Sequence, residues 1–317
     1  MGRSAPRRED RLDVTRPETW SALDGADVVV DLGDATRVPP DELIAWCLSR
    51  GLTVLEATSD GPCVERLHQR FASATSGRLV LGAGIFTGVS NLLARQAARD
   101  LGGAVERVTL GIASSPFSGA GAGTVALMLS ALRQPVVRYE GGRRIEEVGM
   151  TSGRSVDFGA ATRSTLRAPF AESFMLREST GAHDVEVLFS PRPAMLVSSF
   201  KAMPRWLGAS ALGQALFGTY FTVLRRALLR GVTSEVELYA AAEATTSEDL
   251  RRAERKLVAS DGMRAAAWAI AAMVEALLSG AASASSKVCF IDDVCALDPI
   301  VARANALSGD EAMRLLR

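Results

Sequence analysis

Leu79-Val80-Leu81-Gly82-Ala83-Gly84-Ile85-Phe86-Thr87-Gly88 combines an apolar run, a cluster of glycines and the start of a helix. This order of strand, turn and helix is typical of a loop that binds the phosphates of a dinucleotide. Such a loop belongs to the first strand–helix unit of its domain, and an acidic residue follows at the end of the next strand. Here two strand–helix units precede the glycines, and Asp100 falls inside the following helix. We therefore expect a later crossover of a nucleotide-binding sheet.

The residues before this loop alternate between apolar runs and amphipathic segments. Strands are expected at residues 28–32, 53–57 and 78–81, and helices at residues 41–50 and 63–74. Residues 11–14 are compatible with a remnant of a strand, and residues 18–23 with a short helix. The connections are short and each crossover carries a helix, which predicts a parallel sheet.

The pattern changes after residue 105. A half-exposed strand is expected at residues 105–113, a helix at 124–132, and further strands at 136–139, 143–147 and 184–189. Gly141-Gly142 between two of these strands indicates a hairpin. Residues 251–259 and 263–278 are expected to be helical. We therefore expect an α/β fold, with a partial Rossmann-type parallel sheet in residues 1–95. We also expect a mixed α+β domain in residues 96–317 with a helical tail, and packing of its last helices on the first domain is one arrangement to test.

Composition excludes several classes of function. Lys and Arg total 36, and Asp and Glu also total 36, so nothing in the charge indicates a nucleic-acid partner. The four cysteines are scattered among apolar neighbours, which favours buried thiols in a reducing compartment and predicts a cytoplasmic protein. Two histidines are too few for a multi-histidine metal centre, so no metal is expected.

Residues 206–224 raise the question of a membrane. They contain no charged residue, are flanked by Arg205 and Arg225, and approach the length of a bilayer span. Gly, Ser, Gln and Thr residues dilute their hydrophobicity. Two interpretations stay open: a span, or a buried or surface-associated helix.

Several segments, taken in order, resemble the saccharopine dehydrogenase-like oxidoreductases. They are residues 23–30 (LDGADVVV), 47–56 (CLSRGLTVLE), 82–88 (GAGIFTG) with 91–94 (NLLA), 121–124 (GAGT) and 265–280. Each segment alone is a weak signal, but the ordered series spans most of the chain. The resemblance implies hydride transfer that depends on NAD or NADP, with a small-molecule substrate. We also expect a homodimer.

The sequence departs from this family in places. Thr87 stands where the family usually has proline, and Glu56 where it usually has aspartate. Gly2-Arg3 resembles the end of the family's second strand, where Arg3 would face the adenosine phosphate of NADP. By this alignment the first strand, its glycine-rich loop and most of the second strand are missing, so a truncated nucleotide-binding domain is expected. A shortened enzyme, a sheet that is remodelled or completed by another chain, and a relative that has lost cofactor binding all stay open.

Candidate cofactor-binding residues follow from position and from the resemblance. Gly33, Asp34 and Ala35 follow the first clear strand, at the edge of a parallel sheet where ligands bind, and would contact the nicotinamide half. The alternative is a simple turn with local capping. Three further candidates also have structural alternatives. Thr58 would face the same crevice, or it would cap the next helix together with Ser59 and Asp60. Asp13 would contact the adenine half of the cofactor, as the resemblance implies, or it would be a turn residue. Gly82 and Gly84 would bind an anion, or they would allow close packing of strand and helix.

Candidate substrate-binding residues lie in the polar loop of the second domain. The loop precedes a helix, so its amides would bind a carboxylate or phosphate of the substrate. The alternative is a flexible linker with a helix cap at Thr124. The candidates are Ser114, Ser115, Gly121, Gly123 and Thr124.

No catalytic residue is assigned from the sequence. His183 and Asp184 are adjacent, so they cannot form an acid–base pair on one face of a strand. A GxSxG nucleophile elbow is absent from the sequence. The leading hypothesis is an oxidoreductase that uses NAD or NADP, and the rival is a non-catalytic binding or dimerisation protein of the same ancestry.

Overall fold

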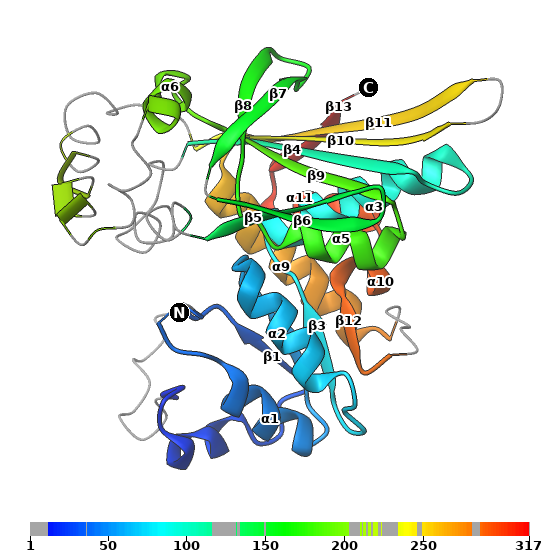
Figure 1. The fold of residues 1–317 in the computed structure, drawn as a ribbon. Helices are drawn as coiled ribbons and strands as arrows, with labels where there is room; N and C mark the ends of the chain where they lie inside the picture. The colour runs from blue at the N-terminus through cyan, green and yellow to red at the C-terminus, as the bar shows by residue number, and fades with distance from the viewer. Residues whose placement is uncertain are drawn as a thin grey trace.

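The computed structural model describes residues 12–35, 37–115, 131, 134–148, 150–202, 210, 212–213, 215–216, 218–220, 223, 234–245, 249–280 and 286–316. Within these residues the chain forms a four-stranded sheet and a nine-stranded sheet. Figure 1 shows the smaller sheet below the larger one, with helices between them. The α/β fold class expected from the sequence is confirmed.

The first sheet is parallel throughout and has the order β1-β2-β3-β12. Its strands are β1 (Val28–Asp31), β2 (Thr53–Glu56), β3 (Arg78–Leu81) and β12 (Val288–Phe290). The first three strands were predicted from their apolar runs. The last comes from the far end of the chain, and its place beside β3 was not foreseen. The helices α1 (Asp41–Ser49) and α2 (Gly61–Phe71) follow β1 and β2, as expected.

The second sheet is mixed and has the order β13-β11-β10-β4-β9-β5-β6. β8 pairs with β9 and β7, and β4 runs parallel to β9. The strands are β4 (Arg107–Ser114), β5 (Pro135–Glu140), β6 (Arg143–Val148), β7 (Thr151–Asp157), β8 (Thr162–Arg167), β9 (Asp184–Pro191), β10 (Val236–Thr245), β11 (Leu250–Ala259) and β13 (Met313–Leu316). The predicted hairpin at Gly141-Gly142 is confirmed between β5 and β6.

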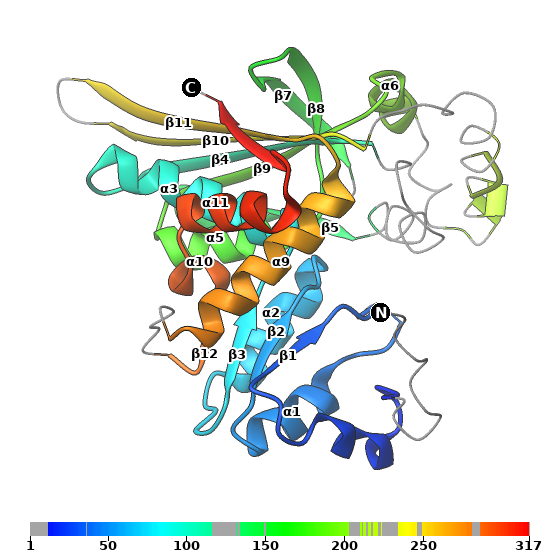
Figure 2. The same ribbon diagram turned by 180° about the vertical axis from the view of Figure 1, so that it is seen from behind.

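Four long helices lie between the second sheet and the first, as Figures 1 and 2 show from opposite sides. They are α3 (Ser90–Leu101), α5 (Glu172–Thr180), α9 (Gly262–Leu278) and α11 (Leu297–Ser308). Shorter helices are η2 (Pro17–Leu23), η3 (Ile85–Val89), α6 (Met195–Ala202) and α10 (Ile291–Val294). α3 runs through the expected domain boundary between residues 95 and 96, and that boundary stays a prediction.

One apolar core joins the two sheets. It includes Leu55 and Val80 of the first sheet, Leu92 of α3, and Leu110 and Leu238 of the second sheet. A second cluster packs α1 and α2 against the opposite face of the first sheet. The first sheet is therefore covered by apolar side chains on both faces, which suits its parallel strands.

Residues 251–259 are strand β11, so the prediction of a helix there was wrong. Arginine and glutamate are good helix formers, and five of these nine residues are Arg, Lys or Glu. The segment instead pairs along its full length with β10, and Leu257 and Ala259 face the core. Tertiary pairing overrides the local helix preference here.

β4 is buried on both faces except at Arg107, so the expected half-exposed strand was also wrong. α3 covers one face, and Phe158 with Tyr239 covers the other at Gly111. Val14 lies in a turn, so no strand remnant is present at residues 12–14. Most of the expected helix at 124–132 and most of residues 206–224 lie outside the described residues. Within the described part, no helix is long and apolar enough to cross a membrane.

Candidate ligand pocket between the two sheets

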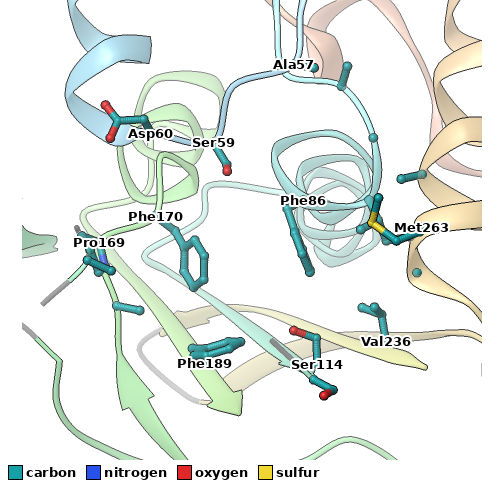
Figure 3. A pocket seen from close by; sticks show the side chains of 18 of the residues that line it. Ala57, Ser59, Asp60, Phe86, Ser114, Pro169, Phe170, Phe189, Val236 and Met263 are labelled. Carbon is teal, nitrogen blue, oxygen red and sulfur yellow. The ribbon is translucent and has the colours of Figure 1, made fainter. Parts of the chain in front are cut away.

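A pocket of about 370 Å³ lies where the first sheet meets the second (Figure 3). The carboxyl ends of β1, β2 and β3 border it from one side, through Gly33, Ser59 and Gly84. Ser114 at the end of β4 and Phe189 of β9 border it from the other. Ligands of open α/β sheets bind at this edge, and the volume falls within the range of small-molecule sites.

Aromatic side chains form much of the wall. Figure 3 shows Phe86, Phe170 and Phe189 around the hollow, each from a different segment. The rings of Phe170 and Phe189 meet edge to face, with 5.6 Å between their centroids. Met263 and Val236 continue the apolar surface on the side of α9. The wall can therefore exclude water from a bound ring system.

The polar groups of the wall are few and mostly uncharged. Figure 3 shows Ser59 and Ser114 pointing into the hollow from opposite sides, while the Asp60 carboxylate points away. That carboxylate accepts hydrogen bonds from the Cys63 amide (2.9 Å) and the Gln134 side chain (2.7 Å). Asp60 is thus the N-cap of α2, which confirms the helix cap weighed from the sequence. Among the described residues that line the pocket there is no Lys, Arg or His.

The glycine loop is shaped by packing at two of its positions. At Gly82 (φ +98°), a Cβ atom would overlap the Thr87 carbonyl oxygen. At Gly88, it would lie 2.8 Å from the Ala83 carbonyl carbon. Gly84 differs, because its φ of +85° suits glycine while the nearest heavy atom to a Cβ would be 3.7 Å away, on Ala266. Gly84 therefore presents bare backbone to the pocket.

A buried carboxyl group lies at the start of α3. Glu172 of α5 is fully buried and accepts hydrogen bonds from the Thr87 amide (2.9 Å) and the Ser90 hydroxyl (3.0 Å). Burial raises the pKa of Glu172. Thr87 has a φ of +54°, unusual for a residue other than glycine. Glu172 thus ties the second half of the chain to the loop that carries Phe86 into the pocket.

Two more carboxyl groups hold the loops that follow β1 and β2. Glu56 accepts a hydrogen bond from the Thr58 amide (3.0 Å), and Asp31 accepts one from the Gly33 amide (2.8 Å). The two residues are register partners on adjacent strands. Burial, followed by the neighbouring charge of Asp31, raises the pKa of Glu56 to about 8. Glu56 is therefore protonated at neutral pH and buried below the pocket-lining Ala57.

Four of the predicted site residues line this one pocket: Gly33, Gly84, Ser114 and Ser115. Thr58 lies between the lining residues Ala57 and Ser59, and its hydroxyl accepts a hydrogen bond from the Asp60 amide. Asp34 and Ala35 lie in the loop after β1, and Gly82 lies in the loop after β3, but none of the three lines the pocket. The binding roles of all these residues stay predictions.

Asp13 lies in a turn, where its carboxylate accepts hydrogen bonds from the amide and hydroxyl of Thr15. Arg3, Gly121, Gly123 and Thr124 lie outside the described residues. The sequence did not single out Phe86, Phe170, Phe189 or Met263. Apolar side chains in a pocket wall carry the same sequence signal as those in a core, so no local pattern could have distinguished them.

Several solved structures match the chain over nearly its whole length. Saccharopine dehydrogenase (L-Glu forming) from Saccharomyces cerevisiae matches 96% of this chain and 88% of its own, with a TM-score of 0.63. The chain has the fold of this dehydrogenase. The two sequences are 13% identical, so the likeness shows the fold and leaves activity and ligands open.

A myo-inositol dehydrogenase from Corynebacterium glutamicum matches 95% of this chain and 84% of its own, at 14% identity. Its TM-score of 0.34 is too low to support an argument. No family model and no curated protein matches the sequence. The fold expected from the sequence resemblance thus agrees with the saccharopine dehydrogenase structure, and function must be argued from the pocket.

Proposed function

We propose that this chain is an oxidoreductase of the saccharopine dehydrogenase-like type that uses NAD or NADP. In this proposal the nicotinamide ring lies in the pocket between the two sheets, beside a small-molecule substrate. The observation that carries it is the position of the pocket, at the carboxyl ends of β1, β2 and β3 and facing the second sheet. When bound, the nicotinamide would supply or accept the hydride.

The described residues suit the ring end of such a cofactor. Gly84 leaves backbone uncovered at the end of β3, so a flat ring can approach closely. Ser59 and Ser114 offer hydroxyl groups to a carboxamide from opposite sides. The phenylalanine wall excludes water, which protects a hydride transfer from side reactions.

The described residues do not suit the diphosphate. No cationic side chain among them lines the pocket, and the start of α3, which a phosphate would approach, holds the Glu172 carboxyl group. The proposal therefore leaves the diphosphate to residues outside the described ranges. The preference for NAD or NADP is likewise left to residues outside the described ranges.

Titration with NADPH and NADH tests the proposal. Reduced nicotinamide fluorescence should increase saturably when the ring enters the apolar pocket. Ala57→Trp, which fills the pocket, should weaken binding at least about tenfold. Ala302→Trp, at an exposed position of α11, is the matched control and should bind as the natural protein does. No saturable change with either nucleotide at millimolar concentration, or equal binding by both variants, would refute the proposal.

A non-catalytic binding protein is the second candidate. Within the described lining, Asp60 is the one residue with an acidic or basic side chain, and its carboxylate is engaged by Cys63 and Gln134. A pocket with no group poised for proton transfer favours binding over chemistry. The two candidates differ in whether a reduced cofactor is oxidised when substrates are supplied. Sedimentation would test the homodimer that either candidate allows.

A further inference from the structure

We propose that the space in this pocket takes an uncharged, largely apolar substrate beside the nicotinamide ring and excludes phosphate, sulfonate and carboxylate groups from its interior. The inference deepens the proposed function and rests on it for the position of the ligand, because both concern the same pocket. It differs from the sequence-based expectation that the substrate presents an anionic group here.

The first argument is the charge of the wall. The described lining residues are apolar or hydroxyl-bearing, apart from Gln134 and Asp60. The charged one is negative, so an anion that entered would lose its hydration without gaining a cationic partner. An apolar ring would instead replace water against Phe86, Phe170 and Phe189.

The second argument is that the helix starts around the pocket are already closed by carboxyl groups of the chain. Asp60 caps α2, and Asp261 caps α9 through the amides of Met263 and Arg264 (3.0 and 3.1 Å). Glu172 occupies the start of α3. Helix N-termini attract anions when their amides are free to donate. Asp60 and Asp261 accept from amides at the starts of α2 and α9, and Glu172 accepts from the Thr87 amide just before α3.

The third argument is the placement of these carboxyl groups. Asp60 itself lines the pocket, and Gly262 and Met263 next to Asp261 line it from the side of α9. Phe86 lines it one residue before Thr87, which binds Glu172. Asp60 therefore belongs to the pocket wall, and Asp261 and Glu172 lie next to the segments that line it. In a poorly solvated site, such an arrangement disfavours a negative ligand.

A pair of fluorescent probes that differ by one anionic group tests the inference in the full chain. N-phenyl-1-naphthylamine is neutral, and 8-anilino-1-naphthalenesulfonate has the same ring framework with a sulfonate. The neutral probe should bind with a Kd at least about fivefold lower than that of the sulfonate. A smaller difference, or tighter binding of the sulfonate, would overturn the inference.

Variants show whether the probe occupies this pocket. Ala57→Trp and Ala266→Trp fill it from opposite walls, so each folded variant should lose the neutral probe, while Ala302→Trp should keep it. Retention of the neutral probe by both filled variants would overturn the inference. Asp60→Asn keeps an oxygen for the helix cap and removes the charge, so it should narrow the difference between the probes. Neither probe contains nicotinamide, so failure here and failure of the NADPH titration are distinguishable.

Discussion

At the scale of the residue, the carboxyl group of Glu172 is the contact that deserves the closest test. It is fully buried, it accepts hydrogen bonds from the Thr87 amide and the Ser90 hydroxyl, and it joins α5 to the loop before α3. Removing a buried acceptor leaves its donors unpaired, which costs more than the hydrogen bonds themselves contribute. This side chain therefore anchors the loop segment that carries Phe86.

Glu172→Ala should lower the free energy of unfolding by about 2–4 kcal/mol, because it leaves two buried donors and a cavity. Glu172→Gln keeps an oxygen in place and should lose about 1 kcal/mol or less at neutral pH. Urea unfolding measures both, with the exposed Glu178→Ala of the same helix as the control. Equal losses for the Ala and Gln variants would contradict this role.

Glu56 predicts a dependence of stability on pH. Its pKa rises from an ordinary 4.5 to about 8 on folding, so the folded chain holds a proton that the unfolded chain releases. This contribution is complete below pH 4.5, is lost as the pH rises to 8, and is constant above that. Glu56→Gln should remove a slope of up to about 1.4 kcal/mol per pH unit in this window.

Urea unfolding at several pH values measures this slope. The exposed Glu311→Gln is the control and should leave the slope unchanged. If Glu56→Gln and Glu311→Gln give the same profile as the natural protein between pH 5 and 8, Glu56 does not hold the proton assigned to it.

At the scale of the element, the turn between β3 and α3 separates two uses of glycine. Gly82→Ala introduces both an unfavourable φ and an overlap with the Thr87 carbonyl group, so it should cost about 3 kcal/mol or more. Gly84→Ala introduces the φ strain alone and should cost about 1–2 kcal/mol. Thermal or urea unfolding of the two variants measures this order, and a reversed order would show that the turn is positioned differently.

The elements also show how far the sequence could be interpreted. β1, β2, β3, α1 and α2 were predicted within a few residues, because apolar runs and proline or glycine boundaries are local signals. β11 was mistaken for a helix, because its partner β10 is what makes a charged segment a strand. The place of β12 beside β3 depends on contacts between distant parts of the chain, which no local pattern contains.

The pocket, like the fold, could be predicted only where the sequence carries a local signal. Gly33 was named because ligands bind at the strand ends of a parallel sheet, and Gly84 because it belongs to the glycine motif. Ser114 and Ser115 were named because their polar loop precedes an expected helix. The aromatic wall was not found, since Phe170 and Phe189 come from segments whose packing against the first sheet only the fold reveals.

At the scale of the whole molecule, the continuous core between the two sheets predicts one cooperative unfolding transition. Side chains from both sheets and from α3 and α9 share a single apolar cluster. Two variants, each with the other tryptophans replaced, can report on the two parts separately. One keeps only Trp20 and Trp46, and the other keeps only Trp268 in α9. Their fluorescence transitions in urea should coincide within error. Separate midpoints would show that the first sheet unfolds independently.

The central claim is that the pocket between the sheets receives the nicotinamide ring, and a crystal structure grown with saturating NADPH tests it most directly. The account predicts density for the ring between Gly84 and Ser114, enclosed by Phe86, Phe170 and Phe189. A ring bound anywhere else on the protein, with this pocket filled by water alone, would contradict the account.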